Sequence, residues 1–198
     1  IKTGPQYYIG DVSLVSKSKI IDSIFNNDIE KSFLKKNRVF ETLNFQKERD
    51  RINSLMKNNG IYNFQINSIF FDVEIDSTRE VYSLPVKIIV EGDDYRKHSI
   101  KEINFINVKN GEEYKEKSFL TNQIEFKENE PFNDSLRSKT IQNLNNLDLF
   151  SFPSIGYEYL SESDKELSAN IFLNPKKKYG LGFGLSLIHI SEPTRPIH

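Results

Sequence analysis

The sequence contains no cysteine, so disulfides, thiol catalysis and cysteine-ligated metals are excluded. A chain without cysteine suits an oxidising periplasm, although it also suits many cytosolic proteins. No stretch approaches the roughly 20 apolar residues of a membrane-spanning helix. The net charge of -1 provides no extended basic field, so nucleic acid is a poor candidate partner. The length of 198 residues, with 37% hydrophobic and 12% aromatic residues, predicts one large or two small packed domains.

Side chains that could support catalysis are also scarce. Of the three histidines, His189 and His198 lie close to the C-terminal end, which leaves His98 alone. No glycine-rich phosphate loop, nucleophile elbow or metal-spaced histidine pair occurs. We therefore expect no enzyme, no catalytic or cofactor-binding residues, no cofactor and no metal, and we expect His98 to be a solvated residue.

Charged residues suggest three further features, each with a structural alternative. Asp72, Glu74 and Asp76 alternate and could share a face suited to a hard cation, but a solvated face is favoured. The run 176–178 could meet anionic lipid head groups, but a plain solvated run before a strand is favoured. Glu48 and Arg51, three residues apart, are expected to form a surface pair, with support of helix-to-strand packing by Arg51 as the alternative.

The first half of the chain predicts two helices among three strands. Asn44 is expected to cap a helix over 45–58, and Gly60 is placed to take the left-handed conformation after its end. Pro85 is expected to mark a bulge or the point where strand pairing begins on one side. The remaining expectations are a strand over 7–15, a short helix near 28–36, strands over 63–76 and 80–92, and a turn at 77–79.

The second half repeats this order. Its expected elements are a strand over 98–108, a short helix over 117–124, a helix over 133–150 capped by Asn133 or Asp134, and strands over 153–160 and 166–175. EKSFLKKNRVF in the first half corresponds to EKSFLTNQIEF in the second. The correspondence indicates an internal repeat of about 90 residues, and therefore two copies of one small α+β domain rather than a solenoid unit.

The repeat resembles the POTRA domain of BamA- and TamA-type outer-membrane β-barrel assembly proteins, in a style similar to proteins of Bacteroidetes-type bacteria. The order of elements carries this resemblance, together with two sets of residues. In the first half these are Glu48, Arg51, Ile52, Leu55, Asn59, Gly60, Tyr62, Phe64, Ile69, Phe71 and Asp72. In the second half they are Phe119, Leu120, Phe132, Thr140, Leu144, Leu147, Phe150, Leu167, Ala169, Ile171 and Leu173.

The resemblance implies an α+β fold of two tandem β-α-α-β-β domains, each a three-stranded mixed sheet covered by two helices. The expected domains are 1–94 and 95–174. Residues 175–187 resemble the start of the first barrel strand, and 188–198 resemble a non-native tail. The chain opens IKTGPQYYIG, without an initiator Met or signal-like region, so we expect a fragment of a longer protein truncated at the barrel.

The implied function is the periplasmic region of an outer-membrane protein assembly factor, on the periplasmic face of that membrane. The implied partners are unfolded outer-membrane proteins and accessory subunits, which add a strand to an exposed sheet edge. The implied sheet order, 1-3-2, leaves the second strand of each copy at an edge. The expected binding residues are Gln65, Asn67, Ile69, Phe71, Val73, Ile155, Tyr157 and Tyr159. Alternatives are a secretion or lipid and surface-structure translocator, and an unrelated α+β binding or adhesion module.

Overall fold

The computed structural model describes residues 6–74, 82–115, 117–160 and 165–176. The first half contains β1 (Tyr8–Ser16), α1 (Lys19–Asn27), α2 (Thr42–Asn58), β2 (Ile69–Val73) and β3 (Ser83–Val90). The second half contains β4 (Ser99–Asn107), α3 (Ser118–Thr121), α4 (Asp134–Asn146), β5 (Ser154–Tyr159) and β6 (Glu166–Leu173). Both halves therefore follow the predicted β-α-α-β-β order. Within the described ranges no helix is long and apolar enough to cross a membrane.

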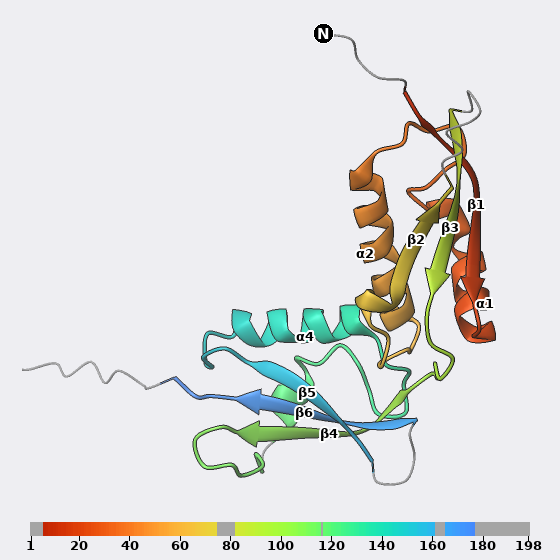
Figure 1. The fold of residues 1–198 in the computed structure, drawn as a ribbon. Coiled ribbons are helices and arrows are strands. Elements are labelled where there is room, and N and C mark those ends of the chain that lie inside the picture. The colour runs from red at the N-terminus through yellow and green to blue at the C-terminus, as the bar shows by residue number, and fades with distance from the viewer. Residues whose placement is uncertain (1–5, 75–81, 116, 161–164, 177–198) are drawn as a thin grey trace, which may run out of the picture.

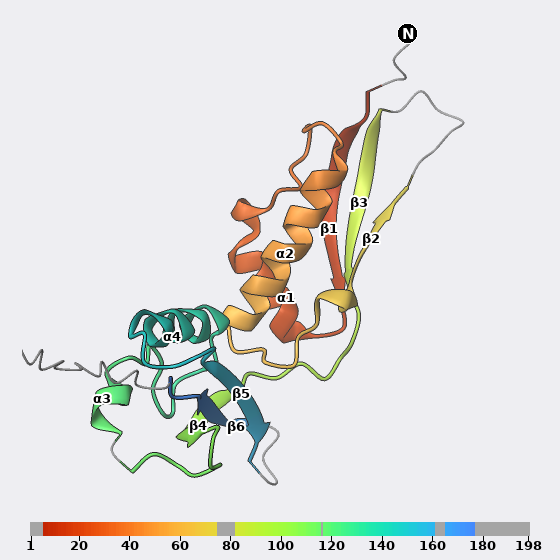
Figure 2. The same ribbon diagram turned by 90° about the vertical axis from the view of Figure 1, so that its left-hand side faces the viewer.

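Each half forms a three-stranded mixed sheet, in the orders β1-β3-β2 and β4-β6-β5. The central strand runs parallel to the first strand and antiparallel to the second. Figure 2 shows α1 and α2 together on one face of the first sheet, and Figure 1 shows α4 lying along one face of the second sheet. The predicted fold class and sheet order are confirmed.

A separate hydrophobic core lies between the helices and the sheet of each half. Alternate residues of a strand point to one face, so one side of β3 and one side of β6 supply most of the sheet's buried residues. These are Leu84, Val86, Ile88 and Val90 in β3, and Leu167, Ala169, Ile171 and Leu173 in β6. Apolar residues at helical spacing cover them, among them Ile21, Phe25, Ile52, Met56 and Leu144.

The first helix lies earlier than the sequence suggested. The expected helix near 28–36 was wrong, because that region forms only a 3-10 turn at Ile29–Lys31, followed by loop. The helix is α1, whose apolar face places Ile21, Ile24 and Phe25 in the core. Of the two apolar clusters in this region, the earlier one forms the helix, and Ile29 of the later one is exposed.

The start of α2 also differs from its prediction, whereas the start of α4 matches. α2 begins at Thr42 after Glu41, so Asn44 lies inside the first turn and does not cap the helix. Asn133 caps α4, and its side-chain oxygen accepts hydrogen bonds from the backbone N–H groups of Ser135 and Leu136. Thus one of the two expected asparagine caps forms.

Pro85 lies at a bulge on one side of β3 and beyond the last described pair on the other, so both features expected at this residue occur. The register between β1 and β3 shifts between Ile9 and Val12, opposite Leu84 to Val86. On the other side of β3, the described pairs with β2 end at Val73 and Val86. Pro85 therefore sits at a bulge and just beyond one ladder, where its missing N–H costs no ladder hydrogen bond. The turn expected at 77–79 lies outside the described residues.

Candidate docking edges and the domain junction

β2 presents unpaired backbone groups along the outer side of the first sheet. The Ser68 carbonyl accepts from the Glu91 N–H, at 2.9 Å, and hydrogen-bonded pairs alternate along an antiparallel ladder. This alternation turns Phe70 and Asp72 towards β3. It turns the N–H and C=O groups of Ile69, Phe71 and Val73 outward, and no described segment pairs with them. These three predicted residues therefore lie on an exposed edge.

The side chains of these three residues point towards the core and do not form a binding surface. Ile69 is buried in the core, and the Phe71 ring packs edge-on against Phe45 with 5.2 Å between ring centroids. The side chains of Phe70 and Asp72 are exposed on the uncovered face. What the edge offers at Ile69, Phe71 and Val73 is therefore backbone, while the exposed side chains come from the residues between them.

Gln65 and Asn67 do not lie on the edge strand. The strand expected over 63–76 begins only at Ile69, because residues 66–68 form a 3-10 turn. Both side chains are exposed on the approach to β2. The prediction of a longer strand was wrong, and its physical reason is that Phe64 turns into the core before extended pairing begins.

β5 forms the corresponding edge of the second sheet. The Leu160 N–H donates to the Glu166 carbonyl, at 3.0 Å, so the same alternation turns the backbone groups of Ile155, Tyr157 and Tyr159 outward. This edge is partly occupied, because the hydroxyl of Tyr62 lies 3.4 Å from the outward carbonyl of Tyr157. The two predicted edges are therefore not equivalent.

The remaining edges, β1 and β4, are partly covered by the chain itself. Ile9 donates to the Arg38 carbonyl and accepts from the Asn37 N–H, which pairs the start of β1 with the loop between α1 and α2. Ile100 exchanges hydrogen bonds with residues 129 and 130, and Asn107 pairs with residues 111 and 112. Covered edges resist unwanted strand pairing. β2 is thus the most completely open edge in the described part of the chain.

An aromatic cluster joins the two halves. Tyr62 follows α2 but packs against the second core, with its ring centroid 5.2 Å from Phe132, 5.5 Å from Tyr157 and 5.8 Å from Tyr159. His98 belongs to the same cluster, 5.9 Å from Tyr62. We call these five residues the junction cluster.

The prediction of a solvated His98 was wrong. Its exposed fraction is 3%, and its Nδ1 lies 3.3 Å from the Tyr62 N–H. Its own N–H donates to the Gly60 carbonyl at 2.8 Å. Gly60 has φ of 96°, which confirms the left-handed conformation expected after α2. The glycine turn therefore aims Tyr62 at the second half of the chain.

A second set of contacts joins the end of α2 to the start of α4. Asn133 donates from its side-chain amide to the Asn58 carbonyl, at 3.1 Å. The Asn58 side-chain oxygen accepts from the N–H and the hydroxyl of Ser135, at 2.9 and 3.0 Å. Figure 1 shows the lower end of α2 next to this end of α4. An orphan carbonyl at the end of α2 is thus satisfied by the Asn133 side chain, and an orphan N–H at the start of α4 by the Asn58 side chain.

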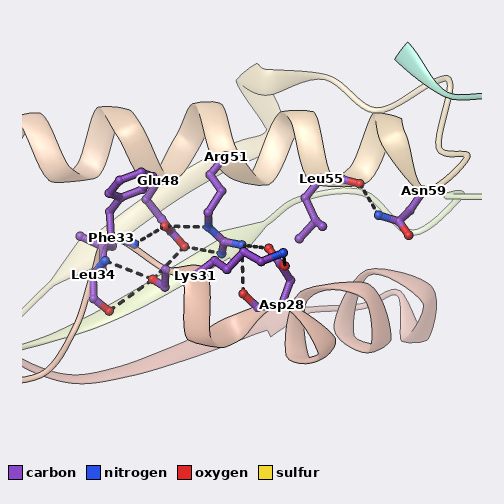
Figure 3. Close-up of polar contacts among 9 residues, drawn as sticks. Asp28, Lys31, Phe33, Leu34, Glu48, Arg51, Leu55 and Asn59 are labelled. Atoms are coloured by element: carbon purple, nitrogen blue, oxygen red, sulfur yellow. Dashed lines mark hydrogen bonds and ion pairs between the residues drawn. The ribbon is translucent and has the colours of Figure 1, made fainter. Parts of the chain in front are cut away.

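Glu48 and Arg51 form a buried structural clamp rather than the expected surface pair (Figure 3). The Glu48 side chain is 0% exposed and that of Arg51 is 11% exposed. Arg51 donates to Glu48 and to Asp28, each with a shortest distance of 2.7 Å, and Glu48 also accepts from Ser32 and the Phe33 N–H. The motif therefore fixes the loop between α1 and α2, rather than the packing of a helix on a strand.

Charge and burial have opposite effects on the pKa values of Asp28 and Arg51 in this clamp. The pKa of the Asp28 carboxyl is lowered, mainly by a hydrogen bond from Lys31. The charges of Lys31 and Arg51 and a hydrogen bond from Arg51 lower it further, while burial opposes the shift. Burial disfavours the charge on Arg51, but hydrogen bonds and attraction to Glu48 and Asp28 raise its pKa overall. The clamp is thus a set of charges that stabilise one another.

Two charge runs noted in the sequence lie apart from the junction. Asp72 and Glu74 are exposed, Glu74 pairs with Lys87, and Asp76 lies outside the described residues. Lys176 pairs with Asp148, whereas 177 and 178 lie outside the described residues. No group of three or more His, Cys, Asp or Glu side chains that could hold a metal occurs in the described ranges.

No family model matches the sequence, and no curated protein matches it either. Two solved structures resemble the fold. One contains POTRA domains 3 to 5 of BamA from Haemophilus influenzae, at 14% identity and a TM-score of 0.56. The other is BamA from Haemophilus ducreyi lacking POTRA domains 1 to 3, at 12% identity and a TM-score of 0.66.

The similarity to these two structures covers 86% of this chain in both cases, so it spans both halves together. Each half of the chain has the POTRA fold. The chain spans 62% of the first matched chain and 30% of the second. The N-terminal POTRA domain contains the open β2 edge, and the C-terminal POTRA domain contains the β5 edge that Tyr62 reaches.

Proposed function

We propose that this chain is the periplasmic POTRA region of an outer-membrane protein assembly or insertion factor. It binds unfolded barrel proteins or accessory subunits, which add a strand to its sheets on the periplasmic face of the outer membrane. The observation that supports this most strongly is the β2 edge, where the backbone groups of Ile69, Phe71 and Val73 point outward. An extended peptide can pair with such groups along its whole length.

Backbone pairing suits a receiver of many clients. Main-chain hydrogen bonds supply the affinity whatever the sequence of the incoming strand, and pockets for alternate side chains add selectivity. Asp72 and Glu74 are exposed beside the edge, and Lys87 lies on the neighbouring strand. Charges beside an edge discourage pairing between two copies of the same edge. The edge is therefore open to clients yet protected against self-association.

Site-specific photo-crosslinking in cells that produce the full-length protein tests this proposal. A photoreactive residue at Asp72, exposed beside the edge, is expected to capture outer-membrane proteins or assembly subunits. The same residue at Asp50, exposed on α2 away from the edge, is the matched control. Adducts of equal yield at both positions, or none at Asp72, would contradict docking at the edge.

A proline substitution separates edge pairing from folding. Val73→Pro removes an outward N–H and leaves the ladder with β3 intact, since edge strands tolerate proline where the N–H faces solvent. Val73→Ala controls for the lost side chain. We expect adducts at Asp72 to decrease in Val73→Pro and to persist in Val73→Ala. Equal adducts in both variants would show that capture does not require the edge N–H.

A further inference from the structure

The flank of α2 beside the open edge contains an arginine, Arg49, that forms no ion pair among the described residues. The guanidinium of Arg49 lies over the Phe71 ring, 5.4 Å from its centroid. Its Nε–H is buried and donates no hydrogen bond to the described residues, and Arg49 forms no ion pair with them. The other arginine of this helix, Arg51, is held by two carboxylates.

A second unsatisfied polar atom lies one helical turn along. Asn53 is four residues after Arg49, so both side chains share one side of α2. The Asn53 Oδ1 is buried and has no hydrogen-bond partner in the described ranges. Buried polar groups without partners are rare because each costs free energy. The unsatisfied donor of Arg49, over Phe71 of the open edge, indicates a position that a ligand completes.

The C-terminal POTRA domain lacks this arrangement. Glu48 and Thr140 are equivalent, because each is fully buried and bonds to the loop before its helix. Ile141, the residue after Thr140, therefore corresponds to Arg49, the residue after Glu48. The arginine that lines the second edge, Arg137, is paired with Asp134 at 2.8 Å. Among the described residues, the arginine without an ion pair therefore belongs to the first edge.

We propose that the β2 edge selects extended segments with an acidic side chain, which Arg49 binds. This inference rests on the proposed strand addition. A strand paired with β2 places a residue directly opposite Phe71, and cross-strand neighbours project from the same face. That residue points to the helix side of the sheet, where Arg49 lies over Phe71. A carboxylate there pairs with the guanidinium.

The charge of the ligand follows from the charge of the site. A guanidinium presents five donors and no acceptor, so a carboxylate matches it and a lysine side chain repels it. The exposed acids Asp72 and Glu74 project from the opposite face of the sheet, where they do not compete for Arg49. The incoming strand thus meets a basic helix side and an acidic open side.

Binding of paired peptides to the full chain tests the selectivity. Two fluorescent peptides of about eight residues, a common strand length, have Glu or Gln at every second position. This design places Glu opposite Phe71 in every second register, so a register with Glu on the helix side of the sheet is available to the peptide. We expect the Glu peptide to bind roughly ten-fold more tightly than the Gln peptide, as for a charge-assisted contact. Added salt is expected to reduce the difference.

Substitutions on α2 assign the effect to Arg49. Arg49→Gln is expected to abolish the preference, and Arg49→Lys to retain part of it. The matched control is Lys47→Gln, which removes a positive charge from another side of the same helix, where Lys47 lies over Phe33. The control is expected to keep the full preference. Thermal melts of each variant check that folding is unchanged.

The possible outcomes distinguish the two levels of the proposal. If both peptides bind equally to the unmodified chain, edge docking stands and acid selection is overturned. If the preference persists in Arg49→Gln, the assignment to Arg49 is overturned. If neither peptide binds, strand addition at β2 is contradicted and this inference falls with it. Binding of anionic lipid vesicles that Arg49→Gln abolishes, without peptide preference, would instead assign Arg49 to a membrane surface.

Discussion

The hydroxyl of Tyr62 in the first POTRA domain lies 3.4 Å from the backbone carbonyl of Tyr157 on the edge of the second. This contact ties two properties together. It holds the domains in one arrangement, and it occupies part of the β5 edge. A strand that pairs fully with β5 has to displace Tyr62, whereas a strand that pairs with β2 displaces no described segment. Docking at the two edges is therefore expected to differ in its dependence on the junction.

Tyr62→Ala is expected to loosen the junction and to lower the free energy of unfolding by about 2 kcal/mol, because it removes several aromatic contacts. Since the chain has no cysteine, a pair of spin labels can be attached to cysteines introduced at two exposed sites, Asp50 and Lys139. The distance distribution between these labels is expected to broaden. Tyr62→Phe keeps the ring and is expected to cost less than about 1 kcal/mol. An unchanged distribution in Tyr62→Ala would contradict the role of the junction cluster.

Glu48→Gln is expected to reduce the free energy of unfolding by about 3 kcal/mol, because it leaves a buried arginine with one fewer carboxylate. Arg51 is only 11% exposed, so water cannot replace the lost partner fully. Urea unfolding measures the change. Asp50→Asn, which removes an exposed acid from the same helix, is expected to change stability by less than about 0.5 kcal/mol. Similar losses in both variants would exclude a special role for the clamp.

The lowered pKa of Asp28 predicts a pH-dependent stability difference. Its carboxylate contributes stability above the ordinary pKa of 3.8, and that contribution disappears as pH falls through the lower pKa of the folded state. Asp28→Asn is therefore expected to be less stable than the unmodified chain at neutral pH, with the gap closing in acid. Denaturant unfolding across this range measures the gap. A difference that is constant with pH would contradict the pKa assignment.

The sequence predicted the fold because its main signals are local and periodic. The alternating residues of β6, the Asn133 cap and the glycine stop after α2 each follow from a few neighbouring residues. The first helix was misplaced because two apolar clusters competed and only tertiary packing decides between them. The extension of β2 back to Gln65 failed because Phe64 is drawn into the core.

The contacts between domains could not be predicted in the same way. Tyr62 and Tyr157 are 95 residues apart, and no periodicity relates them. Asn58 is likewise an ordinary polar residue at a helix end until Ser135 is placed beside it. The unpaired state of Arg49 also appears only in three dimensions, because carboxylates lie near it in sequence but none pairs with it among the described residues. Edge position follows from topology, whereas occupancy of the edge does not.

Amide hydrogen exchange, measured by NMR with and without a bound client peptide, tests the central claim most directly. Strand addition at β2 is expected to protect the outward N–H groups of Ile69, Phe71 and Val73. The inward N–H groups of Phe70 and Asp72, already bonded to β3, serve as internal controls with little change. Alternating protection along β2 at saturating peptide is the result that this account predicts. Unchanged exchange at the three outward amides while the peptide is bound would contradict it.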